Sequence, residues 1–415
     1  MTDLPLVVTL EQGLTLADLA FERRLLRLAG WFGRSAHEPD PDHLPLDPRV
    51  VELIRSEMIR RPVLVLGSLS PDAMRRLCAR LHPAVIPVSA TGGDPASALP
   101  KRFALYGAGY PTLRTSAAKA LPAFPPRPTA LFPALRPHHW VKNLLVFVPL
   151  LAAHRWDEPD LWAKAALALA AFSLVSSAVY LANDLFDLPD DRRHPVKRLR
   201  PLASGAMRPT QALVLFFAAL AMGLALAAPA GFMAILSLYA VTAAAYSLKL
   251  KTWPGIDLTV LVGLYSLRLS AGGMATGIPV SGWLMAYGAC IFASLAMAKR
   301  YAELAGADSG ALPLPQRRGY GLADLHWLAA AGGLSAIGSA LVLLAYLQQP
   351  QARALYGQPI FLMVAGTVLL AWLLRLWRLV VRNRLTGDPV VFALRDPVSL
   401  GAGASALALL ALAAG

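Results

Sequence analysis

Apolar blocks of helical length recur through the last two thirds of the chain and are separated by short polar gaps. Roughly 20 consecutive apolar residues are enough for a helix to cross a bilayer. The pattern therefore predicts nine membrane-spanning helices, of which the first is short and depends on the residues before it. The predicted spans are Trp140–Ala153, Leu161–Phe186, Thr210–Ala228, Gly231–Leu250, Ile256–Ala275, Ser281–Glu303, Leu322–Leu347, Pro359–Val381 and Pro397–Ala414.

The beginning of the chain has a different pattern, in which charged helical stretches at Phe21–Arg34 and Pro48–Arg61 alternate with short apolar runs. Strands that alternate with helices predict a small α/β domain. A stretch with six prolines follows and indicates a linker. We therefore expect a soluble α/β domain over 1–125, a linker over 126–137 and an all-α polytopic membrane domain over 138–415. The candidate strands are Leu6–Leu10, Val63–Leu66, Val85–Val88 and Phe103–Tyr106.

The composition agrees with a membrane protein: of 415 residues, 56% are hydrophobic and 15% are charged. The net charge is +14, and in the membrane part the basic residues gather in the loops after the even-numbered spans, which is the positive-inside pattern. This bias explains the basic charge without nucleic-acid binding, for which no module is present. We expect an inner (cytoplasmic) membrane protein with its N-terminal domain and basic loops in the cytoplasm and its C-terminus outside. With Asp3 and Glu11 near its start, the chain has no visible signal peptide, and Cys78 and Cys290 predict neither a disulfide nor a zinc site.

The most informative polar stretch follows the second predicted span and reads Asn183-Asp184-x-x-Asp187-x-x-x-Asp191, followed by a basic run. Positions i, i+3 and i+7 share one face of a helix, so the three carboxylates should point together. Acids at the end of a membrane helix are costly unless they are compensated, and oxygen ligands suit Mg²⁺. The pattern predicts a catalytic Mg²⁺–diphosphate site, with phosphate contacts from Asn183, Lys197, Arg198 and Arg200. The alternative is that the acids only form salt bridges with Arg192, Arg193 and Arg198.

This acidic pattern resembles the first signature of the UbiA-type superfamily of intramembrane prenyltransferases, and the resemblance extends from about Leu135 to the C-terminus. Within that superfamily the chain looks most like decaprenyl-phosphate phosphoribosyltransferases. The resemblance implies nine helices, a Mg²⁺ cofactor, and transfer of a 5-phosphoribosyl group from phosphoribosyl diphosphate to a polyprenyl phosphate. The stretches that carry it are 136–143, 191–201, 299–303 and 387–396.

The second acidic site of the superfamily corresponds here to Tyr246–Lys251 and Asp257, and Leu261 replaces the usual second acid. A single acid suits the phosphoribosyl branch, although Asp257 could instead only cap the next helix. Arg268 lies three turns along the same face, where it would pair with Asp257 or with a substrate phosphate. For Lys142 we leave open an interfacial anchor or a phosphate contact. The substrate-binding candidates in this part of the chain are Lys142, Tyr246, Lys251, Asp257, Arg268, Lys299 and Arg300.

The stretch Leu6–Thr15 resembles the first strand and loop of haloacid-dehalogenase-like phosphatases, but the catalytic groups of that family are missing from this chain. Thr9 and Glu11 occupy the positions of the two catalytic aspartates, and Ala108 replaces a metal-binding aspartate. Ser68 ends the second strand where the family has a phosphate-binding hydroxyl. With nucleophile and metal ligand both absent, the resemblance implies a degenerate domain without phosphatase activity.

Two other functions remain open. A UbiA-type enzyme could use a prenyl diphosphate and an aromatic or other acceptor. A transporter or lipid-binding scaffold also contains intramembrane acids, but transporters carry them on broken helices at mid-membrane, whereas these acids lie at a helix end beside a basic loop. The polyprenyl chain length and a homo-oligomeric state stay open as well.

Overall fold

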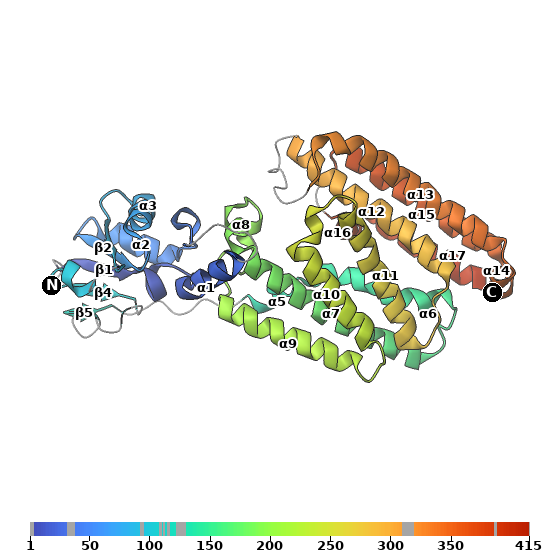
Figure 1. The fold of residues 1–415 in the computed structure, drawn as a ribbon, viewed down its shortest axis with the longest axis horizontal. Helices are drawn as coiled ribbons and strands as arrows, with labels where there is room; N and C mark the ends of the chain where they lie inside the picture. Colours follow the sequence, from blue (N-terminus) through green and yellow to red (C-terminus); the bar gives the residue numbers. More distant parts are fainter. Residues whose placement is uncertain are drawn as a thin grey trace. The chain divides into compact units, whose positions relative to one another are not determined.

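The computed structural model describes residues 4–30, 38–91, 95–107, 110, 113, 117–121, 130–308, 319–385 and 388–414. The chain forms two compact units, whose elements are labelled in Figure 1. The first unit combines Met1–Leu135 with Tyr180–Ala218, and the second combines Arg136–Val179 with Ala219–Gly415. The segment that carries the acidic motif therefore belongs to the same unit as the N-terminal domain.

A five-stranded parallel sheet with the order β3-β2-β1-β4-β5 forms the centre of the N-terminal domain. β1 lies in the middle, and all four of its residues are buried, three of them apolar, as a parallel strand covered on both faces requires. The four predicted strands are confirmed, whereas β5, with two exposed residues, gave no apolar signal. The strands are β1 (Leu6–Thr9), β2 (Val63–Gly67), β3 (Ile86–Ser89), β4 (Ala104–Tyr106) and β5 (Lys119–Ala120).

Helices α2 (Pro48–Glu57) and α3 (Pro71–Leu81) cover one face of this sheet (Figure 1) and share a core with it. Each helix has a proline in its first turn, and the side chains of Asp47 and Ser70 accept hydrogen bonds from the first free backbone N–H groups. We predicted α2 and α1 (Leu19–Gly30) from the sequence, but not α3.

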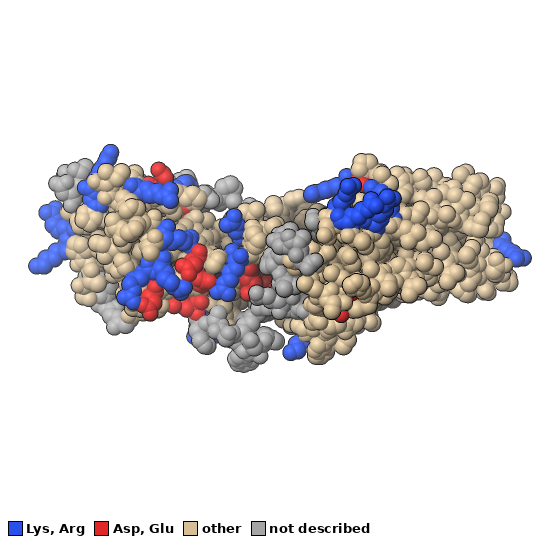
Figure 2. All heavy atoms as spheres, turned by 90° about the horizontal axis from the view of Figure 1, so that it is seen from above, with Lys and Arg blue, Asp and Glu red and all other residues tan. Residues whose placement is uncertain are grey.

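Seven helices in the described part of the chain are long and apolar enough to cross a membrane. They confirm seven of the nine predicted spans. Figure 2 shows a large part of the surface that is mostly tan, with one basic cluster and few other charged side chains. Large apolar residues such as Val214 of α9 and Leu334 of α13 are exposed on these helices, as expected for surfaces that contact lipid. The seven are α7 (Pro159–Phe186), α9 (Pro209–Ala227), α11 (Ile256–Thr276), α12 (Gly282–Asp308), α13 (Leu325–Leu347), α15 (Pro359–Val381) and α17 (Pro397–Ala414).

The first and fourth predicted spans differ from the prediction. The fourth is α10 (Met233–Leu248), which is apolar but has only 16 residues. The first is a 3₁₀ segment, η4 (Pro137–Phe147), followed by the short α6 (Val148–Ala152), and not one α-helix. η4 packs directly on α11 because position 272 is glycine: a Cβ there would lie 2.1 Å from the Val146 carbonyl oxygen.

The predicted linker contains a short helix, α5 (Leu131–Ala134), and residues 122–129 lie outside the described part. The remaining short elements are η1 (Leu10–Leu14), η2 (Pro41–His43), η3 (Pro95–Ala98), α8 (Leu188–Arg193), η5 (Lys197–Leu199), η6 (Leu250–Thr252), η7 (Leu322–Asp324), α14 (Pro350–Leu355) and α16 (Pro389–Ala393).

Candidate functional site

Two of the three predicted metal-binding acids converge on one cation. Asp184, in the last turn of α7, and Asp191, in α8, are both buried. The Arg200 Nη1 atom donates to Asp184 Oδ1 at 3.2 Å and to Asp191 Oδ2 at 2.5 Å. Asp187 lies at the junction of the two helices, where the backbone leaves helical geometry, so the single helical face that we predicted is interrupted there.

The donor atoms suit a divalent cation, but the site as it stands holds Arg200 instead. Among the described residues, no three His, Cys, Asp or Glu side chains converge closely enough to hold a metal ion. Burial raises the pKa of Asp191, and the nearby Asp184 carboxylate adds to this shift while Arg200 opposes it. Two buried carboxylates therefore need a shared positive charge, which Arg200 supplies here.

The other predicted phosphate contacts near these acids are accessible. Lys197 and Arg198 are exposed in η5, and Asn183 is half-buried in the last turn of α7. Of the alternatives stated from the sequence, acid–arginine pairing does occur, but its arginine is Arg200.

A second cluster of charges is buried in the helix bundle. Arg300 of α12 donates to both oxygens of Asp257, with Nε to Oδ2 at 2.5 Å and Nη2 to Oδ1 at 3.0 Å. The Tyr246 hydroxyl donates to Asp257 Oδ1 at 2.8 Å, and Arg300 Nη1 reaches Glu303 at 2.6 Å. Asp257 makes no side-chain cap at the start of α11, so its carboxylate serves this network and not the helix end. Lys251 lies half-buried in η6.

Asp388 joins two of the predicted lysines, although we did not predict it as a site residue. Its Oδ2 atom accepts from Lys142 Nζ at 2.5 Å and from Lys299 Nζ at 3.2 Å. Burial alone would raise the pKa of Asp388, but the two ammonium groups outweigh it and hold the pKa well below its usual range. The sequence signal was the stretch 387–396, which resembles the phosphoribosyltransferases; Gly387 itself lies outside the described residues.

Arg268 does not pair with Asp257. Its Nε atom donates to Asn143 Oδ1 at 2.8 Å, Nη1 to the Leu264 carbonyl and Nη2 to the Tyr239 hydroxyl at 2.9 Å. The guanidinium also lies 4.7 Å from the centre of the Tyr239 ring. Because its nitrogen atoms have partners within the bundle, Arg268 ties η4, α10 and α11 together.

Comparison with known protein families shows the family to which a chain with these buried clusters belongs. The pattern of the UbiA prenyltransferase family matches residues 144–395, which is more than half of the chain. The chain belongs to this family. The match covers the acidic motif, the buried Asp257 network and Asp388. A UbiA-family chain with several apolar helices of spanning length is an integral membrane protein.

Relatives of this UbiA-family chain include protein y4nM of Sinorhizobium fredii, 37% identical over 65% of this chain and 53% of that protein. A decaprenyl-phosphate phosphoribosyltransferase of Mycobacterium tuberculosis is 39% identical over 41% of this chain and 59% of the enzyme. The chain therefore spans little more than half the length of these two relatives. The structure of a UbiA homologue from Archaeoglobus fulgidus bound to DMAPP and Mg²⁺ aligns with a TM-score of 0.50 at 19% identity. It covers 68% of this chain and all of that one, which shows the shared fold.

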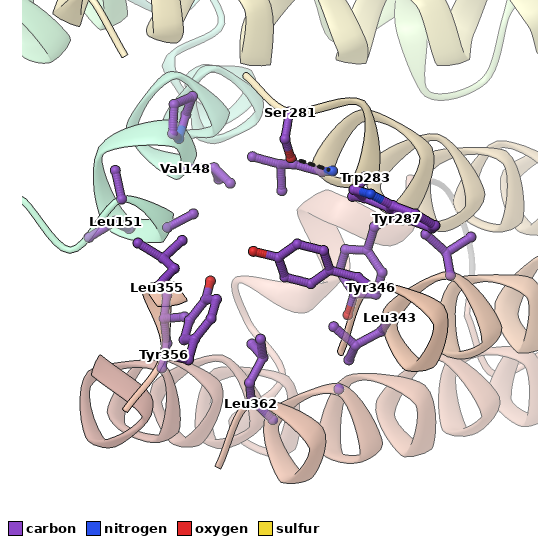
Figure 3. A pocket seen from close by; sticks show the side chains of 18 of the residues that line it. Val148, Leu151, Ser281, Trp283, Tyr287, Leu343, Tyr346, Leu355, Tyr356 and Leu362 are labelled. Carbon is purple, nitrogen blue, oxygen red and sulfur yellow. Dashed lines mark hydrogen bonds between the residues drawn. The ribbon is translucent and has the colours of Figure 1, made fainter. Parts of the chain in front are cut away.

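A large apolar pocket lies in the second unit of this UbiA-family chain (Figure 3). Its volume is about 790 Å³. Its wall is formed by α6, the first turns of α12, the first half of α15, the last turns of α13 and the middle of α17. In Figure 3 the aromatic side chains of Trp283, Tyr287, Tyr346 and Tyr356 surround the space together with leucines. Such a lining suits a hydrocarbon chain and not a phosphate.

In the N-terminal domain, Glu11 and Ser68 are hydrogen-bonded to each other. The Ser68 backbone N–H and hydroxyl both donate to Glu11 Oε1, at 2.9 and 2.5 Å. If the domain is phosphatase-like as predicted, the Glu11 carboxylate accepts from the group expected to bind a substrate phosphate. Thr9 is buried, and Ala108 lies outside the described residues. The likeness to haloacid-dehalogenase-like phosphatases stays a prediction.

Proposed function

We propose that this UbiA-family chain transfers a 5-phosphoribosyl group from phosphoribosyl diphosphate to a polyprenyl phosphate and releases pyrophosphate in a Mg²⁺-dependent reaction. The observation that carries the proposal is the 39% identity, over 182 residues, to an enzyme named decaprenyl-phosphate phosphoribosyltransferase. The buried acid pair and the clusters around Asp388 and Asp257 support it, because they concentrate charged groups at residues of the resembling stretches.

The acidic loop is the proposed diphosphate site. Asp184 and Asp191, with Asp187, would hold Mg²⁺, which when bound neutralises the charge that develops on pyrophosphate. Arg200 then exchanges its carboxylate partners for diphosphate oxygens, a change that its half-exposed position allows. Lys197 and Arg198 add exposed cations to the same loop. Asn183 is the remaining polar contact that we assign to the diphosphate.

Lys142, Lys299, Arg300 and Lys251 are the proposed contacts for the other substrate phosphate. Asp388 Oδ2 accepts a hydrogen bond from each of the two lysines, so their ammonium groups already lie close together. Tyr246 and Asp257 orient Arg300 in the same way. In the reaction the bond from ribose C1 to the diphosphate oxygen breaks, and a bond from C1 to a phosphate oxygen of the lipid forms. The attacking oxygen is already anionic, so no general base is needed.

The apolar pocket is the proposed site for the isoprenoid tail. Tyr287 of the pocket and Lys299 lie on the same helix, 12 residues apart, which corresponds to about 18 Å at 1.5 Å per residue. An isoprenoid phosphate whose head lies near Lys299 can therefore extend its tail along α12 toward the pocket. Tail and head are then bound by surfaces of opposite polarity on one helix.

Filling this pocket should shorten the acceptors that the protein uses. Gly403 of α17 lines the pocket, and nothing lies within 4 Å of a Cβ built there. We expect Gly403→Leu to lower rates with long polyprenyl phosphates several-fold while short acceptors react at the wild-type rate. The matched control is Gly401→Leu, on the same helix and equally open but outside the pocket lining. An equal effect of both substitutions on all chain lengths would contradict the assignment of the tail site.

The proposed orientation places the basic loops in the cytoplasm, as the positive-inside rule predicts. α15 separates Ala354 from Arg384, and both residues are exposed. In a background without Cys78 and Cys290, we expect a membrane-impermeant thiol reagent to label Ala354→Cys but not Arg384→Cys in intact cells. Labelling of Arg384→Cys alone would reverse the topology. We propose an inner (cytoplasmic) membrane location on the same basis.

The diphosphate substrate that the protein cleaves distinguishes the candidate functions. Purified protein in detergent receives labelled phosphoribosyl diphosphate and polyprenyl phosphate, with Mg²⁺ or with EDTA. We expect a labelled lipid and stoichiometric pyrophosphate with Mg²⁺ only. Consumption of a prenyl diphosphate and an aromatic acceptor instead would favour the other UbiA-type reaction. Absence of diphosphate cleavage with either donor would favour a transporter or a lipid-binding scaffold.

A further inference from the structure

The loop after α7 is built into the N-terminal domain. Phe21 and Leu25 of α1 pack against a cluster that contains Leu185 and Leu188 on one side of the acidic motif and Leu202 beyond it. All these residues belong to the first compact unit. A domain without the phosphatase residues thus contributes apolar surface to the segment that carries Asp184 and Asp191.

A buried ion pair joins the two parts directly next to an acidic ligand candidate. Arg192 Nη1 and Nη2 donate to the two oxygens of Glu22 at 2.7 and 2.6 Å, and both side chains are more than nine-tenths buried. Arg192 Nε also donates to the Ala203 carbonyl at 3.3 Å. Two parallel hydrogen bonds between a guanidinium and a carboxylate fix direction as well as distance. Because Arg192 follows Asp191 in α8, this pair constrains the helical turn that presents Asp191.

Two further contacts hold the same loop. Arg193 donates through Nε and Nη2 to Asp40 at 3.0 and 2.7 Å. Gly205 has a φ of +77°, and a Cβ at this position would lie 2.4 Å from the Leu16 Cβ. Only glycine combines this backbone conformation with so close an approach. The loop is therefore held by the N-terminal domain at its beginning and near its end.

We infer that the N-terminal domain is a positioning element for the metal-binding loop, and that Glu22 acts through Arg192 on the placement of Asp191. The inference rests on the proposed metal site at Asp184 and Asp191. Glu22 and Arg192 are positioning residues, since neither is placed on substrate or metal. Because Arg192 adjoins Asp191 in α8, we expect loss of the pair to act like loss of an outer partner of a metal ligand, which typically weakens metal affinity 10- to 100-fold.

The test measures Mn²⁺ binding to the purified full-length protein by electron paramagnetic resonance in the presence of inorganic pyrophosphate, whose oxygens give Arg200 an alternative to the two carboxylates. We expect Glu22→Gln to weaken Mn²⁺ binding by about tenfold or more. We expect the charge-reversed pair Glu22→Arg with Arg192→Glu to recover most of this loss. Hydrogen exchange over residues 188–204 should be faster in Glu22→Gln and return toward the wild-type rate in the reversed pair.

Controls separate positioning from stability. Ile54→Val removes a buried methyl group from the same domain, far from the loop in sequence, and should lower the thermal midpoint while Mn²⁺ affinity stays at the wild-type value. Wild-type affinity in a folded Glu22→Gln protein would overturn the inference. If Glu22→Gln does not fold, the reversed pair decides: recovered Mn²⁺ binding supports positioning, and a folded reversed pair that does not bind overturns it. Absence of Mn²⁺ binding by the wild type is a different result, which removes the proposed metal site itself.

Discussion

Replacing Asp184 or Asp191 by asparagine will lower Mg²⁺-dependent turnover by about 100- to 1000-fold, because each change removes one of two buried carboxylates that share a cation. Stabilisation of transition-state charge by a metal ion contributes several kcal/mol, and each ~1.4 kcal/mol is tenfold in rate. Asparagine keeps the size of the side chain, so the protein should still insert and fold. The measurement is the initial rate of pyrophosphate release by purified variants at saturating Mg²⁺.

Asp190 supplies the matched control for this prediction. It lies in the same short helix as Asp191, is exposed and falls outside the acidic motif. Asp190→Asn should therefore keep a rate close to that of the wild type. Asp187→Asn should resemble the Asp184 and Asp191 variants if all three acids act together. Near-normal rates for both Asp184→Asn and Asp191→Asn would remove the metal site from the proposed mechanism.

The long helices could be predicted closely because the signal lies within each segment. α15 and α17 begin and end at the predicted residues, since a proline opens each one and an apolar block of spanning length follows. The 3₁₀ geometry of η4 could not be predicted in this way. It depends on the close approach to Gly272, which lies in another helix and leaves no mark on the periodicity of residues 137–147.

The site shows the same division between local and distant information. Spacing alone indicated that Asp184 and Asp191 approach each other, since both lie within a few helical turns of one segment. It did not indicate that Asp388 would join Lys142 and Lys299, because the three residues lie far apart in the sequence. Nor could it assign Arg192 to Glu22 in the N-terminal domain, because an arginine in a basic run has no sequence feature that names its partner.

Breaking the buried Asp257–Arg300 pair should have the largest effect on stability. Both side chains are almost fully buried, with Asp257 0% and Arg300 1% exposed. Removing one partner of a buried ion pair typically costs about 3–5 kcal/mol, because the other charge is left uncompensated. We expect Asp257→Asn to lower the thermal midpoint of the detergent-solubilised protein strongly. Glu158→Gln, which breaks an exposed pair with Arg155, should leave the midpoint unchanged.

The double variant distinguishes a lost charge partner from lost packing. Asp257→Asn with Arg300→Met removes both charges and keeps an unbranched side chain in the space of Arg300. Replacing a buried ion pair by apolar groups is often neutral, so the double variant should recover most of the midpoint lost by Asp257→Asn. The double variant should nevertheless remain inactive if Arg300 binds a substrate phosphate, since methionine offers no positive charge. A stable and fully active double variant would restrict this pair to a structural role and would leave Lys142 and Lys299 as the phosphate contacts beside it.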